Sequence, residues 1–177
     1  MTGDDVLDLD VDGYRVERLG PADAAVVQRL YERCSDYHQL EEGIPTRPGA
    51  AAHLLAALPP GREAADKYVL GVRAPGGELV GVMDLIRDCP DRNEWWLGLL
   101  MLDPDVRGSG LGGRLYRAVE QAVRSGGATS IYLGVLEQNP SAERFWRSHG
   151  FQELRRQPYT AASGHQSRVI VMRHRLA

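Results

Sequence analysis

The sequence predicts an α+β fold in which helices cover both faces of a mixed, mostly antiparallel central sheet of six to seven strands. Two apolar runs, at about 67–74 and 78–87, flank Pro75-Gly76-Gly77, which is a signal typical of a β-hairpin. Farther along, residues 109–125 carry apolar side chains at helical spacing. They precede residues 131–136, whose nearly continuous apolar character indicates a strand buried on both faces in a parallel pair. A strand, a helix and a strand in this order form a right-handed crossover.

Before the hairpin, the sequence predicts one strand and two helices. Residues 14–19 form a short strand, and Gly20-Pro21-Ala22-Asp23 opens a helix that runs to about Cys34, with Val26, Val27, Leu30 and Tyr31 on one face. Residues 35–48 contain a glycine and two prolines and are expected to form a loop. A second helix at about 49–58 ends at a proline pair, because proline has no N–H with which to continue a helix.

After the hairpin, turn signals separate the remaining apolar segments. The turn over 88–93 leads into a third strand. The expected elements from there are a strand at 94–102, the helix at 109–125, the strand at 131–136, a short helix at 140–149 and two final strands at 151–157 and 167–175.

The composition is that of one ordinary globular domain. The chain has 177 residues, of which 43% are apolar and 25% charged, and its formal net charge is -3. This charge lacks the basic footprint of a nucleic-acid-binding protein. No apolar run approaches the roughly 20 residues that span a bilayer, and the N-terminus lacks the pattern of a secretory signal. Cys34 and Cys89 show no metal-ligand spacing. We therefore expect a cytoplasmic protein that binds no metal, nucleic acid or membrane.

The first twelve residues are acidic and contain five aspartates. We expect residues 1–12 to form a flexible, solvated tail and residues 13–177 to form a single domain. Contact between the tail and a cationic substrate is the alternative.

The segment after the strand at 94–102 is the richest in glycine. Arg107 stands before glycines at four of six positions: Gly108, Gly110, Gly112 and Gly113. Glycine lets successive backbone N–H groups point into one concavity, and a helix N-terminus adds about half a positive charge. Arg107 can add a charge-assisted contact. The segment therefore predicts a site for a phosphate or a pyrophosphate.

Three other interpretations of this segment compete. A Walker A loop requires a lysine after its last glycine, where this chain has Arg114. A dinucleotide fingerprint fits Gly108, Gly110 and Gly113, with Glu137 as the ribose-binding acid. That loop normally follows its strand directly and lies early in a longer doubly wound domain. A nucleotide-dependent oxidoreductase stays an alternative, as does a glycine-rich turn that binds nothing.

Two motifs in this chain resemble the signatures of the GNAT acyltransferase family. The first signature, Arg/Gln-x-x-Gly-x-Gly/Ala after a strand and a proline, matches residues 107–112, with Pro104 in place. The second, Asn-x-x-Ala-x-x-aromatic-aromatic followed by Gly-Phe, matches residues 139–151 from Asn139 to Phe151. The element order of the whole chain also agrees with that of the family.

The resemblance implies how acetyl-CoA lies as the co-substrate. In the family, two parallel strands splay apart and leave a V-shaped slot for the pantetheine arm. Here the arm is expected along the backbone of Leu100, Met101 and Leu102, and the pyrophosphate against Arg107, Gly108, Ser109, Gly110, Leu111, Gly112 and Gly113. Asn139 and Trp146 would flank the arm on its other side, and a core-facing position is the alternative for Trp146.

The resemblance also implies an N-acetyltransferase in which a primary amine attacks the thioester directly. A general base would help, because an amine with a pKa of about 10.4 is mostly protonated at pH 7. Glu94 is the first candidate, since strand alternation puts it on the same face as Gly98 and Leu100, and some family members carry a base on this strand. Asp84, inside an otherwise apolar strand, is the second candidate.

The general acid is missing from its usual place. Many family members use a tyrosine four residues before the Gly-Phe pair, where this chain has Trp146. Tyr159 and Ser148 are alternative proton donors, unless the thiolate leaves unaided. The substitution keeps a non-catalytic acyl-CoA sensor as an alternative function.

The family places acceptor specificity in the loop between the first helices and in the last strand connection. In this chain those segments hold Tyr37, His38 and Tyr159, which we expect to contact a small-molecule or protein amine. Glu41 and Glu42 in the same loop would suit a cationic amine, although a solvated loop explains them equally well. The resemblance allows either a monomer or a homodimer.

Overall fold

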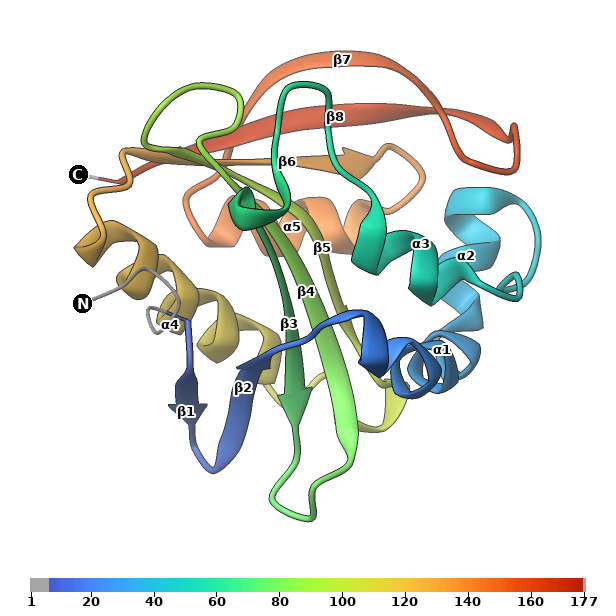
Figure 1. Ribbon diagram of the computed structural model, residues 1–177. Coiled ribbons are helices and arrows are strands. Elements are labelled where there is room, and N and C mark those ends of the chain that lie inside the picture. Colours follow the sequence, from blue (N-terminus) through green and yellow to red (C-terminus); the bar gives the residue numbers. More distant parts are fainter. Residues whose placement is uncertain (1–6, 177) are drawn as a thin grey trace.

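The computed structural model describes residues 7–176, which form one eight-stranded sheet with helices on both faces (Figure 1). The strands are β1 Leu9–Val11, β2 Tyr14–Arg18, β3 Lys67–Arg73, β4 Leu79–Arg87, β5 Glu94–Leu102, β6 Ser130–Leu136, β7 Gln152–Thr160 and β8 Gln166–Arg175. Their order in the sheet is β1-β2-β3-β4-β5-β6-β8-β7. Neighbouring strands pair antiparallel except β5 and β6, which are parallel. The predicted α+β class and the parallel pair are confirmed.

Five α-helices accompany the sheet in the described part of the chain: α1 Ala24–Arg33, α2 Ser35–Glu42, α3 Ala50–Ala56, α4 Leu111–Ser125 and α5 Pro140–Ser148. Short 3-10 turns occur at Pro21–Asp23, Ala64–Asp66 and Pro104–Val106. None of the helices within residues 7–176 combines the length and the apolar character that crossing a membrane requires.

The helices bury apolar stripes against opposite faces of the sheet. On α4, Leu111, Leu115, Val119 and Val123 recur every four residues, so they share one helix face, and all are at most 2% exposed. This stripe packs with Leu85 and Leu97 of the sheet. On the other face, Leu30 of α1 and Ala51 of α3 pack with Val82 and Met101. Figure 1 shows α1, α2 and α3 gathered at one side of the molecule and α4 at the other.

The first strand corrects the predicted tail and explains why the sheet exceeds six to seven strands. Residues 9–11 form β1 and pair with β2, and Leu7 and Val11 are buried in the core. Apolar residues alternate with exposed aspartates over residues 7–12, which is the pattern of a half-buried strand. The connection is the two-residue turn Asp12-Gly13, in which both φ angles are positive, as in a type I′ hairpin. The rest of the predicted tail, residues 1–6, lies outside the described residues.

The second correction concerns the predicted loop at 35–48. Its first half is helix α2, which follows α1 after Cys34 and ends where Gly43 adopts a φ of 70°. A left-handed glycine at this position is the usual end of a helix. The sequence does not predict this helix because it lacks an apolar stripe, and His38 is its only buried residue.

Halfway along its length, strand β5 loses one of its two partner strands and reverses the faces of its side chains. It pairs with β6 only from Glu94 to Leu97, so the two strands separate beyond this point, as predicted. In the pairing with β4, Asp84 is opposite Leu99 and Leu85 is opposite Leu97, so Gly98 is the extra residue of a β-bulge. Because side chains alternate along a strand, the bulge reverses the faces used by the second half of β5.

Candidate functional site

The separation of β5 from β6 opens a slot in the middle of the sheet. Gly98 of β5 and Gly134 of β6 are exposed although both belong to central strands. A cavity of about 120 Å³ lies here, and α5 contributes Asn139, Ala142 and Trp146 to its wall. Beyond Leu97 the edge of β5 that faces the slot has no partner strand, so its backbone groups are available to a bound chain. The remaining lining residues are Tyr37, Leu97, Leu99, Leu100, Leu133, Val135 and Leu136.

The glycine loop brings α4 to one end of this slot. Gly108 and Gly110 have φ angles of 75° and 79°, a region that L side chains rarely adopt. No side chain caps the first turn of α4, so its N–H groups remain free for an anion. A second cavity, of about 240 Å³, is lined here by Leu100, Met101, Leu102, Arg107, Asn139, Ser141 and three residues of α2: Asp36, Tyr37 and Leu40.

Arg107 fastens this loop to helix α2. Its Nη1 donates to Asp36 Oδ2 at 2.6 Å, and its Nε donates to the carbonyl of Leu102 at 2.7 Å. The hydrogen bond from Arg107 holds the pKa of Asp36 below its usual range. The guanidinium therefore serves the architecture of the loop, and its predicted contact with a pyrophosphate stays a prediction. Gly113 also has a packing role, because a Cβ there would lie 2.9 Å from Nε2 of His149.

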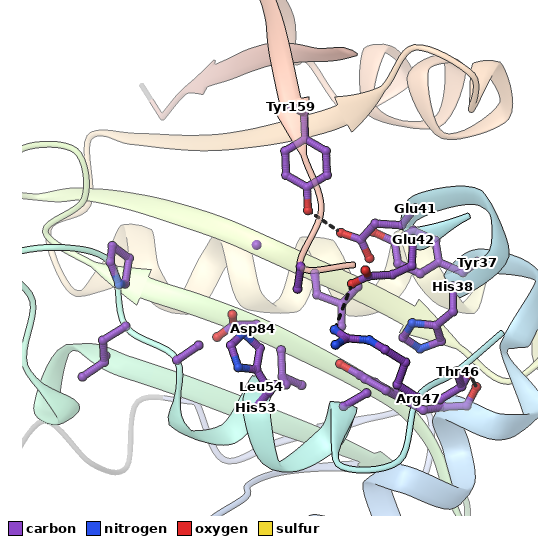
Figure 2. A pocket seen from close by; sticks show the side chains of 18 of the residues that line it. Tyr37, His38, Glu41, Glu42, Thr46, Arg47, His53, Leu54, Asp84 and Tyr159 are labelled. Atoms are coloured by element: carbon purple, nitrogen blue, oxygen red, sulfur yellow. Dashed lines mark hydrogen bonds and ion pairs between the residues drawn. The ribbon is translucent and has the colours of Figure 1, made fainter. Parts of the chain in front are cut away.

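A third cavity, of about 570 Å³ and larger than the other two, adjoins the slot on the side of α1 to α3 (Figure 2). Its floor comes from the sheet, with Lys67, Asp84, Ile86, Trp96, Gly98 and Leu99. Helix α2 contributes Tyr37, His38, Glu41 and Glu42, and α3 contributes Ala50, His53 and Leu54. Tyr159 reaches it from β7, and its hydroxyl donates to Glu41 Oε1 at 2.8 Å. Segments that are far apart in the sequence thus enclose one space.

Asp84 lies on the floor of this cavity in contact with a buried lysine. Its Oδ1 is 2.9 Å from Nζ of Lys67, and the two side chains are 14% and 7% exposed. Burial raises the pKa of Asp84, and Lys67 opposes this shift. Oδ2 of Asp84 lies 3.2 Å from the place where Gly98 would carry a Cβ, so the carboxylate faces the junction with the slot. Sequence reasoning missed Lys67, whose signal was a charge at the start of an apolar strand.

Glu94 lies at the beginning of β5, away from this junction. Its Oε1 accepts a hydrogen bond of 3.0 Å from the hydroxyl of Tyr132, and it lines none of the three cavities. The expected alternation also fails beyond the bulge. Leu100 pairs with Met83 and packs with the buried stripe of α4, so it lies on the face opposite Trp96. Of the two predicted bases, the structure brings only Asp84 to the cavity.

Three other predicted residues differ in where the structure places them. Trp146 is 8% exposed and makes edge contacts with Tyr116 and Phe151, so it belongs to the core as well as lining the slot. His38 is buried against the ring of Tyr31 and still borders the large cavity. Ser148, an alternative proton donor, is exposed and lines none of the three cavities.

Tyr37 is the residue that the three cavities have in common. The slot and the large cavity also share Gly98 and Leu99. The slot and the cavity of about 240 Å³ lined by Arg107 share Leu100 and Asn139. A ligand beside Arg107 can therefore extend through the slot and meet a second ligand in the large cavity.

Solved structures with the same fold come from several organisms. An acetyltransferase from Thermus thermophilus superposes with a TM-score of 0.71 at 20% identity and covers 95% of this chain and 100% of its own. The ribosomal-protein-S18-alanine N-acetyltransferase from Escherichia coli gives 0.69 at 17% identity, covering 93% and 94%. The PaiA N-acetyltransferase from Thermoplasma acidophilum, solved in complex with coenzyme A, gives 0.65 at 18% identity, covering 92% and 99%.

Sequence comparison adds relatives and a family. Uncharacterized N-acetyltransferases of Mycobacterium tuberculosis and Mycobacterium bovis are 29% identical over 97 residues, which are 55% of this chain. The match spans 61% of the length of these relatives. Residues 27–151 match the acetyltransferase (GNAT) family over α1 to α5, including the slot and the glycine loop. On this match, which covers more than half of its length, the chain belongs to the GNAT acetyltransferase family.

Proposed function

We propose that this protein is an N-acetyltransferase that moves the acetyl group of acetyl-CoA to a primary amine of a small-molecule or protein acceptor. The observation that carries the proposal is the common wall of Tyr37, Gly98 and Leu99 between the slot and the large cavity. This wall gives two ligands one meeting point. Membership of the GNAT family supports the choice of reaction.

The residues of the slot and loop fit acetyl-CoA. Gly98 and Gly134 leave the slot open, and the unpaired edge of β5 supplies backbone donors and acceptors for an extended arm. The free N–H groups at the start of α4 suit the pyrophosphate. We assign Leu100 to Leu102, Arg107 to Gly113, Asn139 and Trp146 to this binding site. When bound, acetyl-CoA supplies the thioester that the amine attacks.

In the large cavity, Asp84 is the proposed general base. A lysine-like amine has a pKa of about 10.4, so only on the order of one molecule in 2,500 is neutral at pH 7. That protonation costs roughly 4–5 kcal/mol at about 1.36 kcal/mol per pKa unit. Asp84 can take the proton directly or through water, because it faces the junction beside Gly98. A backbone N–H of the unpaired part of β5 can donate to the carbonyl oxygen as its charge develops.

The proton donor and the cellular location belong to the same proposal. Tyr37 borders both the slot and the large cavity and is the candidate for protonating the leaving sulfur, whereas the hydroxyl of Tyr159 already donates to Glu41. Cys34 and Cys89 are free thiols, which suits a reducing cytoplasm.

A thermal-shift titration followed by a transfer assay tests the proposal. Acetyl-CoA at about 100 times its Kd should stabilise the protein by roughly 2.7 kcal/mol, which raises the Tm of a chain of this size by roughly 5–10 °C. Amines should then release CoA thiol, while NAD should cause no shift. A shift without thiol release across an amine panel would favour an acyl-CoA sensor, and a shift with NAD alone would favour an oxidoreductase.

A further inference from the structure

Three carboxylates line the large cavity, and they differ in their partners. Asp84 forms an ion pair with Lys67 at 2.9 Å, and Glu42 lies 3.6 Å from Nη2 of Arg47. Glu41 forms no ion pair with any residue in the part of the chain that the structure describes, 7–176. It accepts one hydrogen bond, from the hydroxyl of Tyr159. Glu41 is therefore the carboxylate of this cavity whose charge has no cation beside it.

The surroundings of Glu41 penalise its negative charge. The side chain is half-buried, and burial is the main cause that raises its pKa, with a smaller contribution from Glu42. A carboxylate removed from water costs free energy unless it is paired. A cation placed beside Glu41 would remove this cost.

Aromatic rings complete the environment that a cation requires. Tyr37 and Tyr159 line the cavity together with Glu41, and burial followed by the charge of Glu41 raises the pKa of both hydroxyls. Phenol rings attract ammonium groups through their π faces, and the attraction grows when water is excluded. A carboxylate and two tyrosines suit an ammonium group better than an anion or a neutral group.

This position is not the place where the amine reacts. Asp84 lies on the sheet beside Gly98, at the junction with the slot. Glu41 lies on α2 under Tyr159, on a different wall of the cavity (Figure 2). An acceptor that reacts beside Asp84 and also pairs with Glu41 on the other wall would therefore carry two amino groups.

The cavity also limits the size of this acceptor. The turn between β7 and β8 is fastened to α2, because Ser163 donates from its N–H to Glu42 Oε2 and from its Oγ to the Glu42 carbonyl, both at 2.7 Å. The cavity volume of about 570 Å³ falls in the range of small-molecule sites. This volume suits a short flexible molecule.

We propose that Glu41, Tyr37 and Tyr159 form a subsite for a second ammonium group, and that the acceptor is a small aliphatic diamine or longer polyamine. The inference rests on the proposed function for its reacting amine. The subsite itself is a binding site and can be tested without turnover.

The experiment compares each member of a series of 1,n-diaminoalkanes with the n-alkylamine of the same length, in which a methyl group replaces the second ammonium. Calorimetry measures the binding of both to the full chain, and the transfer assay measures kcat/KM. We expect the wild-type protein to bind the best diamine more tightly than its matched monoamine by roughly 30-fold or more. The Glu41→Gln variant should lose this preference and keep its affinity for the monoamine.

Two further variants test whether a lost preference for diamines is specific to the charge of Glu41. Glu42→Gln alters the neighbouring acid, which already lies beside Arg47, and should keep the preference for diamines. Glu41→Asp keeps the charge on a side chain shorter by one methylene, so its best diamine should be about one methylene longer. Equal affinity for diamines and monoamines in the wild type would overturn the inference, as would an equal loss of both in Glu41→Gln. Diamine binding without acetylation of any amine would overturn the proposed function and leave the subsite standing.

Discussion

Asp84 and Glu94 are the two predicted bases, and only Asp84 borders a cavity. Both are half-buried acids on neighbouring strands of one sheet. Glu94 accepts a hydrogen bond from the hydroxyl of Tyr132, whereas Asp84 faces the junction beside the bulge residue Gly98. A bulge leaves no unique pattern in one sequence beyond a glycine inside a strand. Strand alternation alone therefore favoured Glu94.

Substitution of the two acids separates their roles. If Asp84 is the base, Asp84→Asn should lower kcat by roughly 10²- to 10⁴-fold, while Glu94→Gln should stay within a few-fold of the wild type. The base acts only when deprotonated, so kcat/KM of the wild type should fall as the pH drops through the pKa of Asp84. Burial raises that pKa, which moves the acid limb above the usual range of an aspartate. Steady-state rates between pH 5 and 9 measure both effects.

Lys67 provides the control for this pH dependence. Its ammonium favours the ionised carboxylate and lowers the pKa of Asp84, so Lys67→Met should move the acid limb to higher pH. Because Asp84→Asn leaves the buried charge of Lys67 unpaired, the double variant serves as a check on folding. An acid limb that shifts with Glu94→Gln and ignores Lys67→Met would return the role of base to Glu94.

At the scale of elements, the start of α4 is where we propose that the pyrophosphate of acetyl-CoA binds. Gly110 precedes the helix with a φ of 79°, and a large side chain there would occupy the space in front of the free N–H groups. Gly110→Trp should therefore abolish the acetyl-CoA thermal shift.

Gly127 offers a matched control for that substitution. It has a φ of 92° and open space around it, and it follows the opposite end of the same helix. The helix has 15 residues, so the two sites are about 22 Å apart. Gly127→Trp carries the same backbone strain of about 1–2 kcal/mol and should keep the shift. Equal loss in both variants would mean that strain, and not the loop, explains the result.

Helices with one clear apolar face could be predicted from the sequence, and the helix that faces a cavity could not. Helix α4 repeats buried leucines and valines every four residues, and its predicted span overlaps the observed one. Helix α2 turns Tyr37, Glu41 and Glu42 toward a cavity instead of a core, so it lacks an apolar stripe. For β1 the alternation and the Asp12-Gly13 turn were present, but the aspartates gave the segment the composition of a tail.

At the scale of the whole molecule, the two halves of the site differ in how local they are. The predicted acetyl-CoA residues lie in two compact segments, 100–113 and 139–146, and a motif can find such segments. The large cavity, proposed to hold the acceptor, is lined by residues of α2, α3, β4, β5 and β7. Tyr159 donates to Glu41 across 118 positions of sequence, and no spacing rule encodes such a contact. For this reason candidate acids could be identified from the sequence, but their positions around the large cavity could not.

The wall shared by Tyr37, Gly98 and Leu99 has a kinetic consequence. If acetyl-CoA and the amine bind on the two sides of this wall, as proposed, they adjoin each other, and neither Cys34 nor Cys89 lines any of the three cavities to accept the acetyl group in between. Both substrates must then be present together in a ternary complex. Double-reciprocal plots at several fixed acetyl-CoA concentrations should intersect. A dead-end CoA analogue should be a competitive inhibitor against acetyl-CoA and should not be competitive against the amine. Parallel lines would instead reveal a covalent relay through the protein.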